Sequence, residues 1–349
     1  MATRPTPSDI RAARAANPKL RARDLADQLG ISEAEYVAAW CGHGTRRIGT
    51  DFEAIFPKLE ALGEVMALTR NASAVHEKIG VYDKFHTGRH AAMMLGETID
   101  MRMFPAHWVH GFAVEEGEGE EARRSLQFFD AHGEAVHKVH LRPASDVDAW
   151  RHLVESVTSA NQEPEVEVAP VRRTAAANDS NVPVDLLQRR WRAMTDTHQF
   201  VGILRKLEIS RLTALSHIGD DFAWRLDNSS VEAMMRLSAA EQLNIMCFVG
   251  NRGCIQIHSG PISEIKTMGP WINILDPGFH MHLRADRIAQ AWAVRKPTDK
   301  GHVTSLEAYD ANGDLIIQFF GKRIEGMDER PGWRTIMEGL PRVESSRAA

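Results

Sequence analysis

The feature that most constrains this chain is an internal repeat. Four blocks of the first half align with four blocks of the second half at a constant offset of 180 residues, without an insertion between them. The aligned blocks are 71–80 with 251–260, 101–104 with 281–284, 112–114 with 292–294, and 125–133 with 305–313. Further upstream, Leu29-Gly-Ile-Ser32 aligns with Leu207-Glu-Ile-Ser210 at an offset of 178. Such self-similarity predicts a protein built from two copies of one structural unit.

The repeat sets the expected domain boundaries. A length of 349 residues fits two domains at about 150 residues each. We expect a first unit over 1–158 and a second over 185–349. The intervening 159–184 is rich in proline, alanine and polar residues and has neither helical nor strand periodicity, so it is predicted to be a linker.

Hydrophobic periodicity predicts the fold class of each copy. Residues 10–68 and 185–241 carry helical spacing, and the rest of each copy alternates apolar with polar residues. Asp130–Gly133 and Asp310–Gly313 interrupt the alternating runs and are typical of hairpin turns. We therefore expect an α+β protein, in which each unit has helices followed by a large antiparallel β-sheet.

Composition narrows the class of protein. Hydrophobic residues make up 43% of the chain and charged residues 26%, as in globular proteins. A net charge of −5 gives no general attraction to nucleic acid. No stretch approaches the roughly 18 apolar residues of a membrane span, and the polar N-terminus lacks the apolar core of a secretory signal. The three cysteines form no Cys-X-X-Cys pair, so we expect a reduced, cytoplasmic protein.

One motif imitates a DNA-binding element. Arg23–Tyr36 has the small-residue, glycine and apolar spacing of a helix-turn-helix. A DNA-reading second helix needs basic or amide side chains, whereas this one carries Glu33 and Glu35 and no basic residue. The second copy keeps part of the motif, so we expect it to serve packing.

Three closely spaced histidine pairs raise the possibility of a metal site. They are His107 with His110, His137 with His140, and His280 with His282. Strand residues three apart point to opposite faces, which excludes chelation by the second pair, and the first pair lacks a nearby third ligand. His280 and His282 share a strand face and could bind one ion. This pair therefore supports the alternative that the chain is a non-haem metal-binding protein. A solvated strand face is the simpler interpretation.

His198 stands out because the repeat does not require it. Leu187, Trp191, Met194, His198 and Val201 follow one another at spacings of 4, 3, 4 and 3, which predicts a single helical stripe. The first copy has a leucine, residue 20, in place of the histidine, so the fold itself does not need an imidazole. Helix N-cap types at 195 and 196 place the histidine near a helix start. A neutral imidazole facing an apolar cavity suits haem iron.

The same comparison marks Arg102. Strand alternation in Met101-Arg-Met-Phe104 places Arg102 and Phe104 on one face. The second copy has His282 in place of the arginine, so this position differs between the copies while its surroundings are alike. An ordinary surface arginine is the alternative interpretation.

Five motifs follow one another between about residue 20 and residue 340. They are Arg70–Lys78, Asp100–Phe104, Phe128–Gly133 with His137–Val139, Thr195–Phe200, and Val294–Thr298. Together they resemble the hemin-degrading, haem-utilisation factor family, cytoplasmic proteins encoded beside bacterial haem-uptake transporters. The resemblance implies a tandem α+β repeat with a large antiparallel sheet, in agreement with the repeat found above.

The resemblance also implies a haem site. It places the proximal iron ligand, and hence the metal contact, at His198, the distal arginine at Arg102, and a pocket phenylalanine at Phe104. The remaining pocket and propionate residues that it implies are Arg211, Phe248, Lys296, Gln318 and Arg323. Cations suit propionates, and aromatic side chains suit the macrocycle. Tyrosines that often stand near this pocket in the family are replaced by Ile317 and Phe320, which implies a drier pocket.

Two functions remain open at this point. The chain is either a carrier that takes haem from an uptake ABC transporter and hands it to a haem oxygenase or reductase, or an enzyme that opens the macrocycle and releases iron with dioxygen or a reduced nicotinamide. Without a Cys-X-X-Cys-His motif, haem b would be bound non-covalently. No dinucleotide-binding fingerprint is present, because the nearest cluster, Gly117-Glu-Gly119, is flanked by glutamates. No catalytic residue is identified, and neither nucleic acid nor membrane insertion is expected.

Overall fold

The computed structural model of this chain describes all residues except 1–3, 89–90, 172–176, 324–329 and 344–349. It forms two compact units. Unit 1 consists of Met1–Asn71, Val75–Val171 and Gly250–Gln256, and unit 2 consists of Ala72–Ala74, Arg172–Val249 and Ile257–Ala349. Residues 172–176 of the predicted linker lie outside the described residues, so the linker stays a prediction.

The first half of the chain begins with three helices and continues mainly with strands. Its elements are α1 (Pro7–Ala16), α2 (Ala22–Leu29), α3 (Glu33–Ala38), β1 (Thr45–Ile48), α4 (Phe52–Leu59), β2 (Val65–Arg70), β3 (Ala74–Gly80), β4 (Phe85–Thr87), β5 (Ala92–Leu95), β6 (Asp100–Met103), β7 (His110–Glu116), β8 (Arg123–Phe129), β9 (Ala135–Leu141) and α5 (Val147–Val157). Short 3-10 turns follow α4, β6 and β7.

The second half repeats this order. Its elements are α6 (Val184–Arg192), α7 (Gln199–Leu207), α8 (Arg211–Ile218), β10 (Ala223–Leu226), α9 (Ser230–Ala240), β11 (Ile245–Gly250), β12 (Cys254–Gly260), β13 (Ile265–Met268), β14 (Trp271–Asp276), β15 (Phe279–Arg284), β16 (Gln290–Thr298), β17 (Gly301–Tyr309), β18 (Leu315–Gly321) and α10 (Pro331–Gly339). No helix in the described ranges is both long and apolar enough to cross a membrane.

The strand order confirms the duplication. The first half contains the neighbours β1-β7-β8-β9-β2-β3 and the second contains β10-β16-β17-β18-β11-β12. The pairings described along both series are antiparallel, and the predicted turns at 130–133 and 310–313 join β8 to β9 and β17 to β18. The α+β prediction is therefore confirmed.

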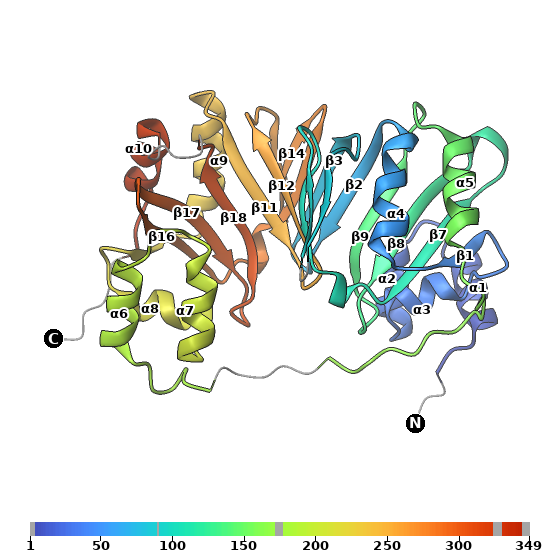
Figure 1. Ribbon diagram of the computed structural model, residues 1–349, viewed down its shortest axis with the longest axis horizontal. Coiled ribbons are helices and arrows are strands. Elements are labelled where there is room, and N and C mark those ends of the chain that lie inside the picture. Colours follow the sequence, from blue (N-terminus) through green and yellow to red (C-terminus); the bar gives the residue numbers. More distant parts are fainter. Residues whose placement is uncertain (1–3, 89–90, 172–176, 324–329, 344–349) are drawn as a thin grey trace. The chain divides into compact units, whose positions relative to one another are not determined.

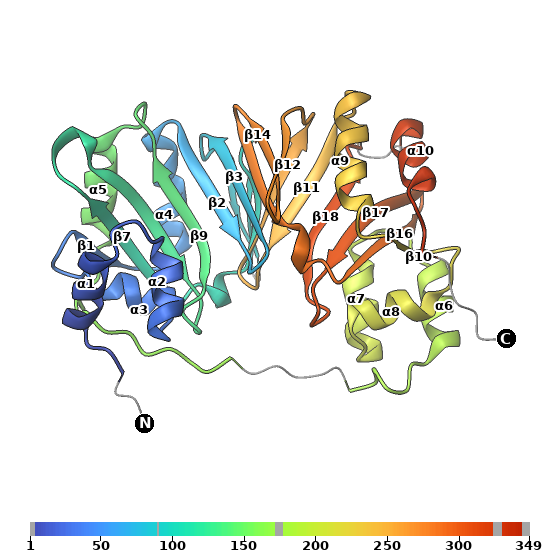
Figure 2. The ribbon, with the colours of Figure 1, turned by 180° about the vertical axis from the view of Figure 1, so that it is seen from behind.

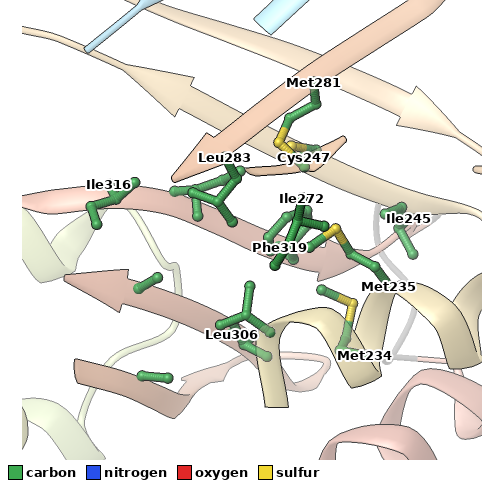
Figure 3. Close-up of a cluster of buried hydrophobic side chains, with 14 of the residues drawn as sticks. Met234, Met235, Ile245, Cys247, Ile272, Met281, Leu283, Leu306, Ile316 and Phe319 are labelled. Carbon is green, nitrogen blue, oxygen red and sulfur yellow. The ribbon is translucent and has the colours of Figure 1, made fainter. Parts of the chain in front are cut away.

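Helices cover both faces of the strands in each unit (Figures 1 and 2). In unit 1, α4 and α5 share one apolar core with the strands, and α1–α3 share another. In unit 2, α9 and α10 cover one face and α6–α8 cover the other. Strand alternation explains the division, because Ala291 and Ala293 of β16 belong to the first core, whereas Trp292 and Val294 belong to the second. Figure 3 shows Met234 and Met235 of α9 inside the first of these cores.

One detail of the sequence-based prediction needs correction. Strands β1 and β2 interrupt the range 10–68, and β10 interrupts 185–241, although both ranges were expected to be helical. β1 and β10 have only four residues each, too few to show their period in the sequence.

The motif at 23–36 does form two helices, α2 and α3. There Glu33 is buried and paired with Arg70 and Lys138, which is a packing role as expected.

Each unit takes a short segment from the other half of the chain. Unit 1 contains Gly250–Gln256, and unit 2 contains Ala72–Ala74, two regions that the repeat relates to each other. In unit 1, Asn251 Nδ2 donates to the main-chain oxygen of Arg70 at 2.9 Å. We call Ala72–Ala74 and Gly250–Gln256 the exchanged segments.

The surroundings of the exchanged segments differ in polarity. In unit 1, Thr69 Oγ1 lies 3.4 Å from Cys254 Sγ and 2.8 Å from His137 Nδ1. Tyr82 OH lies 2.5 Å from His137 Nε2 and completes this buried chain. The equivalent positions in unit 2 are all apolar: Ala74, Val249, Ile262 and Ile317. Because a buried polar group needs hydrogen-bond partners, each segment fits the unit that holds it better than it would fit the other.

Limited proteolysis tests the predicted linker. We expect the first cleavage within 159–184, because its proline-, alanine- and polar-rich composition favours an accessible chain. The two fragments should separate on a denaturing gel but stay together in native size-exclusion chromatography, because each unit contains a segment of the other half. A first cut within 70–140 would contradict the two-unit interpretation.

Candidate functional site

His198 lies at the start of a helix, at the surface of unit 2. It is the residue before α7, and its side chain is 94% exposed. Its Nδ1 lies 2.7 Å from Asp196 Oδ1, which also accepts the His198 main-chain N–H at 2.7 Å. These two hydrogen bonds lower the pKa of Asp196. With Nδ1 held by the carboxylate, Nε2 is the ring nitrogen that can bind a metal.

The predicted stripe through His198 is wrong in one respect. The stripe assumed one continuous helix, but α6 ends at Arg192 and α7 begins at Gln199. Leu187, Trp191 and Met194 are buried as expected, whereas Val201 is exposed. Asp196 Oδ1 accepts the His198 main-chain N–H in the turn between the two helices, and α7 begins one residue after the histidine, close to where Thr195 and Asp196 were expected to place a helix start.

A buried carboxylate gathers three of the predicted pocket residues. Glu307 on β17 is fully buried, and Arg211, the first residue of α8, pairs with it through Nε at 2.8 Å and Nη2 at 2.6 Å. Lys296 Nζ on β16 and Gln318 Nε2 on β18 each lie 2.9 Å from Glu307 Oε1. The hydroxyl of Tyr309 also donates to this carboxylate. We call Arg211, Lys296, Glu307, Tyr309 and Gln318 the Glu307 cluster.

The Glu307 cluster carries a surplus positive charge. Burial opposes ionisation of Glu307, but Arg211 and Lys296 outweigh it and hold the pKa of that carboxyl well below its usual range. Burial lowers the pKa of Lys296 to about 8, although Glu307 acts in the opposite direction. At neutral pH two cations therefore face one carboxylate. The remaining positive charge can attract an anionic group of a ligand.

Phe200 connects the Glu307 cluster with the helix that follows His198. Phe200 is buried in α7, two residues after the histidine. Lys296 Nζ lies 4.8 Å from its ring centroid, and the guanidinium carbon of Arg211 lies 5.1 Å from it. One aromatic ring thus contacts both cations, which places the start of α7 beside the cluster.

Aromatic side chains adjoin the cluster on neighbouring strands. Phe248 of β11 lies opposite Gln318 in the strand register, and its ring centroid is 5.0 Å from that of Phe320. Phe320 shares the strand face of Gln318, but Ile317 points the other way and is buried among α9 and its neighbours. Of the two positions expected to dry the pocket, only Phe320 is therefore next to the cluster.

Arg323 and the two predicted distal residues are more exposed. Arg323 is exposed beyond the end of β18, and its charge helps to lower the pKa of Asp196. Arg102 on β6 belongs to unit 1, is 35% exposed and pairs with Asp100. Phe104 directly follows β6 and donates its main-chain N–H to Gly253 O at 2.9 Å. The distal roles of Arg102 and Phe104 stay predictions.

The histidine pairs give no support to a non-haem metal site. His280 and His282 share a face of β15, with ring centroids 6.4 Å apart, and His282 Nδ1 lies 2.7 Å from Asn273 Oδ1. His107 lies in a 3-10 turn, and His110 begins β7. The described part of the chain holds no group of three or more histidine, cysteine or acidic side chains placed to bind one ion.

The sequence-based reasoning missed Glu307 and Phe200. The repeat contained a signal for Glu307, because the first copy has Gln127 at that position. That is the same kind of difference that marked His198. No comparable signal identifies Phe200. Its role in the site depends on its contacts with Arg211 of α8 and Lys296 of β16, which the sequence does not show.

Comparisons with known proteins agree with this duplicated arrangement. The family model of the haemin-degrading HemS.ChuX domain matches the chain twice, at residues 30–157 and 208–340. The hemin transport protein HemS of Yersinia enterocolitica is 39% identical over 323 residues, which cover 92% of this chain and 93% of that protein.

Two solved structures are similar over nearly the whole chain. The holo form of PhuS, a heme-binding protein from Pseudomonas aeruginosa, has a TM-score of 0.94 and 41% identity, with 97% of this chain and 100% of that chain covered. ChuS, a heme oxygenase of Escherichia coli, has a TM-score of 0.84 and 36% identity, with 94% of this chain and 98% of that chain covered.

Proposed function

Since this chain belongs to the haemin-degrading HemS.ChuX domain family, we propose that it binds haem non-covalently and carries it within the cytoplasm. The haem would come from an uptake transporter and pass to a downstream oxygenase or reductase. The printed functions of its relatives support this proposal, since HemS is a hemin transport protein and PhuS a heme-binding protein.

The residues of unit 2 fit the chemistry of haem. The carboxylate of Asp196 holds Nδ1 of His198, which leaves the opposite nitrogen as an iron ligand. The surplus charge of the Glu307 cluster, together with Arg323, suits propionates. Phe248 and Phe320 offer an aromatic wall for the macrocycle.

One observation carries the proposal: His198 stands two residues before Phe200, whose ring contacts both cations of the Glu307 cluster. A neutral nitrogen ligand, positive charge and aromatic surface thus occur together in one unit. Titration of the purified protein with haem tests the proposal. We expect one haem per chain with a sharp Soret band, and an absent band would refute haem binding.

The propionate cations give a graded prediction. A charge-assisted hydrogen bond contributes about 1.5–3 kcal/mol, or roughly tenfold to a hundredfold in affinity. Lys296→Ala should therefore weaken haem binding without abolishing the Soret band. Arg323→Ala should weaken it less, because its side chain is exposed and screened by solvent.

Arg211→Ala, the third variant of this series, also removes the bidentate partner of Glu307, so its melting temperature must be measured together with its dissociation constant. Arg151→Ala is the matched control, since Arg151 is an exposed arginine on α5 of unit 1 that pairs with the exposed Asp148. An unchanged haem dissociation constant in all three cation variants would place the haem elsewhere.

Haem degradation is the second candidate function, favoured by the similarity to the heme oxygenase ChuS. Because the sequence has no dinucleotide fingerprint, the electrons would come from an external donor. The test is to incubate the purified haem complex with NADPH, ascorbate or peroxide and to determine the mass of any product. A ring-opened tetrapyrrole with released iron would establish degradation, whereas intact haem under all three conditions would establish the carrier.

A further inference from the structure

Unit 1 contains a cavity that the proposed haem chemistry does not use. Its volume is about 690 Å³, within the range of small-molecule sites. The connection between α1 and α2, helix α3, and strands β1, β7, β8 and β9 supply its walls. Its apolar lining comprises Pro18, Leu20, Ala22, Tyr36, Val37, Trp40 and Val114.

The wall of this cavity contains an amide that is only partly satisfied. Gln127 of β8 is 8% exposed, and its Nε2 donates to Ser125 Oγ at 3.0 Å. Its Oε1 is buried and has no hydrogen-bond partner among the residues that the structure describes. Turning the amide over would only transfer the missing partner from the oxygen to the nitrogen. Buried polar atoms usually have hydrogen-bond partners, so a donor on a ligand that reached this amide would supply the one it lacks.

The lining is also strongly cationic. Glu116 is 3.0 Å from Arg123, and Glu115 is 2.6 Å from Arg124, so these four charges cancel in pairs. The other cations of the lining are Arg14, Lys19, Arg21 and Lys138. Lys138 shares the Glu33 carboxylate with Arg70, and neither Lys19 nor Arg21 has an ion pair among the described residues. The cavity therefore has an excess of positive charge.

The repeat explains what is different in this unit. The position of Gln127 corresponds to Glu307, which accepts from Arg211, Lys296 and Gln318 in unit 2. At that place unit 1 has a neutral amide in a cationic surrounding. In unit 2 the Glu307 carboxylate is thus the anion at this point of the fold. In unit 1 the same point has no carboxylate of its own, and the positively charged cavity can accept an anionic ligand.

We propose that this cavity is a second binding site, whose ligand is an aromatic anion: a flat ring system with one carboxylate, sulfonate or phosphate group. The rings would lie against Tyr36 and Trp40, and the charged group would face the cationic lining. Gln127 would give its unused hydrogen-bonding capacity to the ligand. The proposal does not depend on haem binding in unit 2.

Isothermal titration calorimetry with 8-anilinonaphthalene-1-sulfonate tests the site, because this probe combines aromatic rings, one anionic group and an N–H donor. The haem-free full chain should bind the probe with a definite stoichiometry that includes a site sensitive to Gln127→Glu. This substitution introduces the residue that unit 2 has at the same position, but unit 1 has Glu33 and Glu116 in place of Arg211 and Lys296, so the melting temperature of the variant is measured together with its affinity. The added carboxylate repels the anion, and we expect the affinity to fall by about tenfold or more.

Two comparisons separate the cavity from other apolar surfaces. The double substitution Lys19→Gln with Arg21→Gln should weaken binding severalfold, whereas Lys58→Gln, an exposed lysine on α4 outside the cavity lining, should not. Uncharged N-phenyl-1-naphthylamine should bind more weakly than the sulfonate and should not respond to Gln127→Glu. Equal affinity of wild type and Gln127→Glu for the sulfonate, with unchanged melting temperatures, would overturn the proposal.

Discussion

Replacing His198 with leucine is expected to remove the ligand that we propose for haem iron while leaving the protein folded. The side chain is 94% exposed, and the first copy has a leucine at the equivalent place, so stability should change little. Loss of a partner that only orients a metal ligand costs 10–100-fold in affinity, so loss of the ligand itself should weaken haem binding by at least about 100-fold. The Soret band should shift or broaden.

The chain offers a matched control for this experiment. His217 is another exposed histidine in a helix of unit 2, and its Nδ1 lies 2.9 Å from Thr213 O. His217→Leu should keep the wild-type spectrum and affinity. Arg102→Ala should keep the proposed contact of His198 with the iron and alter the environment that is proposed for the distal side of the haem. A wild-type Soret band and affinity in His198→Leu would end the assignment and make His76 or His282 the next candidate.

Removing the charge of Glu307 is expected to have the largest effect on stability. Glu307→Gln leaves Arg211 and Lys296 close together in a buried site without their shared counter-charge. Breaking a buried ion pair in this way costs about 3–5 kcal/mol, which chemical denaturation will measure as a lower free energy of unfolding. Glu264→Gln is the control, because Glu264 pairs with Lys266 at the surface, where both side chains are exposed.

The other unit indicates how to repair this variant. In unit 1 the carboxylate is on the helix, as Glu33, and pairs with Lys138 on the strand beside Gln127. Transferring that arrangement requires Arg211→Glu, Glu307→Gln and Gln318→Lys together, which keeps the net charge. The triple variant should regain at least half of the stability lost by Glu307→Gln. If it is less stable than the single variant, charge balance is not what holds this site together.

The pH dependence follows from the same carboxylate. The pKa of Glu307 in the folded protein is far below its ordinary value of 4.5, so its stabilising contribution is fully present above pH 4.5. Below pH 4.5 the unfolded chain takes up the proton first, and the free energy of unfolding falls as pH decreases toward the folded pKa. Glu307→Gln should lack this component of acid unfolding.

The repeat allowed much of the architecture to be predicted from the sequence. The two copies follow from blocks aligned at a constant offset, and within each copy hydrophobic periodicity gives the α+β class and the turn residues give the hairpins at 130–133 and 310–313. The comparison of copies also singled out His198. The first copy has a leucine at the equivalent position, so the fold does not require a histidine there.

What could not be predicted depends on long-range contacts. The helix break before Gln199 is one example, because a hydrophobic period continues across the turn between α6 and α7 without recording it. The Glu307 cluster unites residues from α8 and three strands, and periodicity cannot show which of them meet. The exchanged segments are equally hidden, because 71–74 and 251–254 align equally well whichever unit holds them.

The exchanged segments also say something about how such a chain can be encoded. If the gene were divided at 159–184, neither product would contain all the parts of its own core, since one lacks Cys254 and the other lacks Ala74. Two separate polypeptides would have to complement each other to regain the native state. A copy that occurred alone would have to obtain this segment from a second molecule. One polypeptide that carries both copies supplies each unit with its segment and allows the two copies to differ in sequence, as Glu307 and Gln127 do.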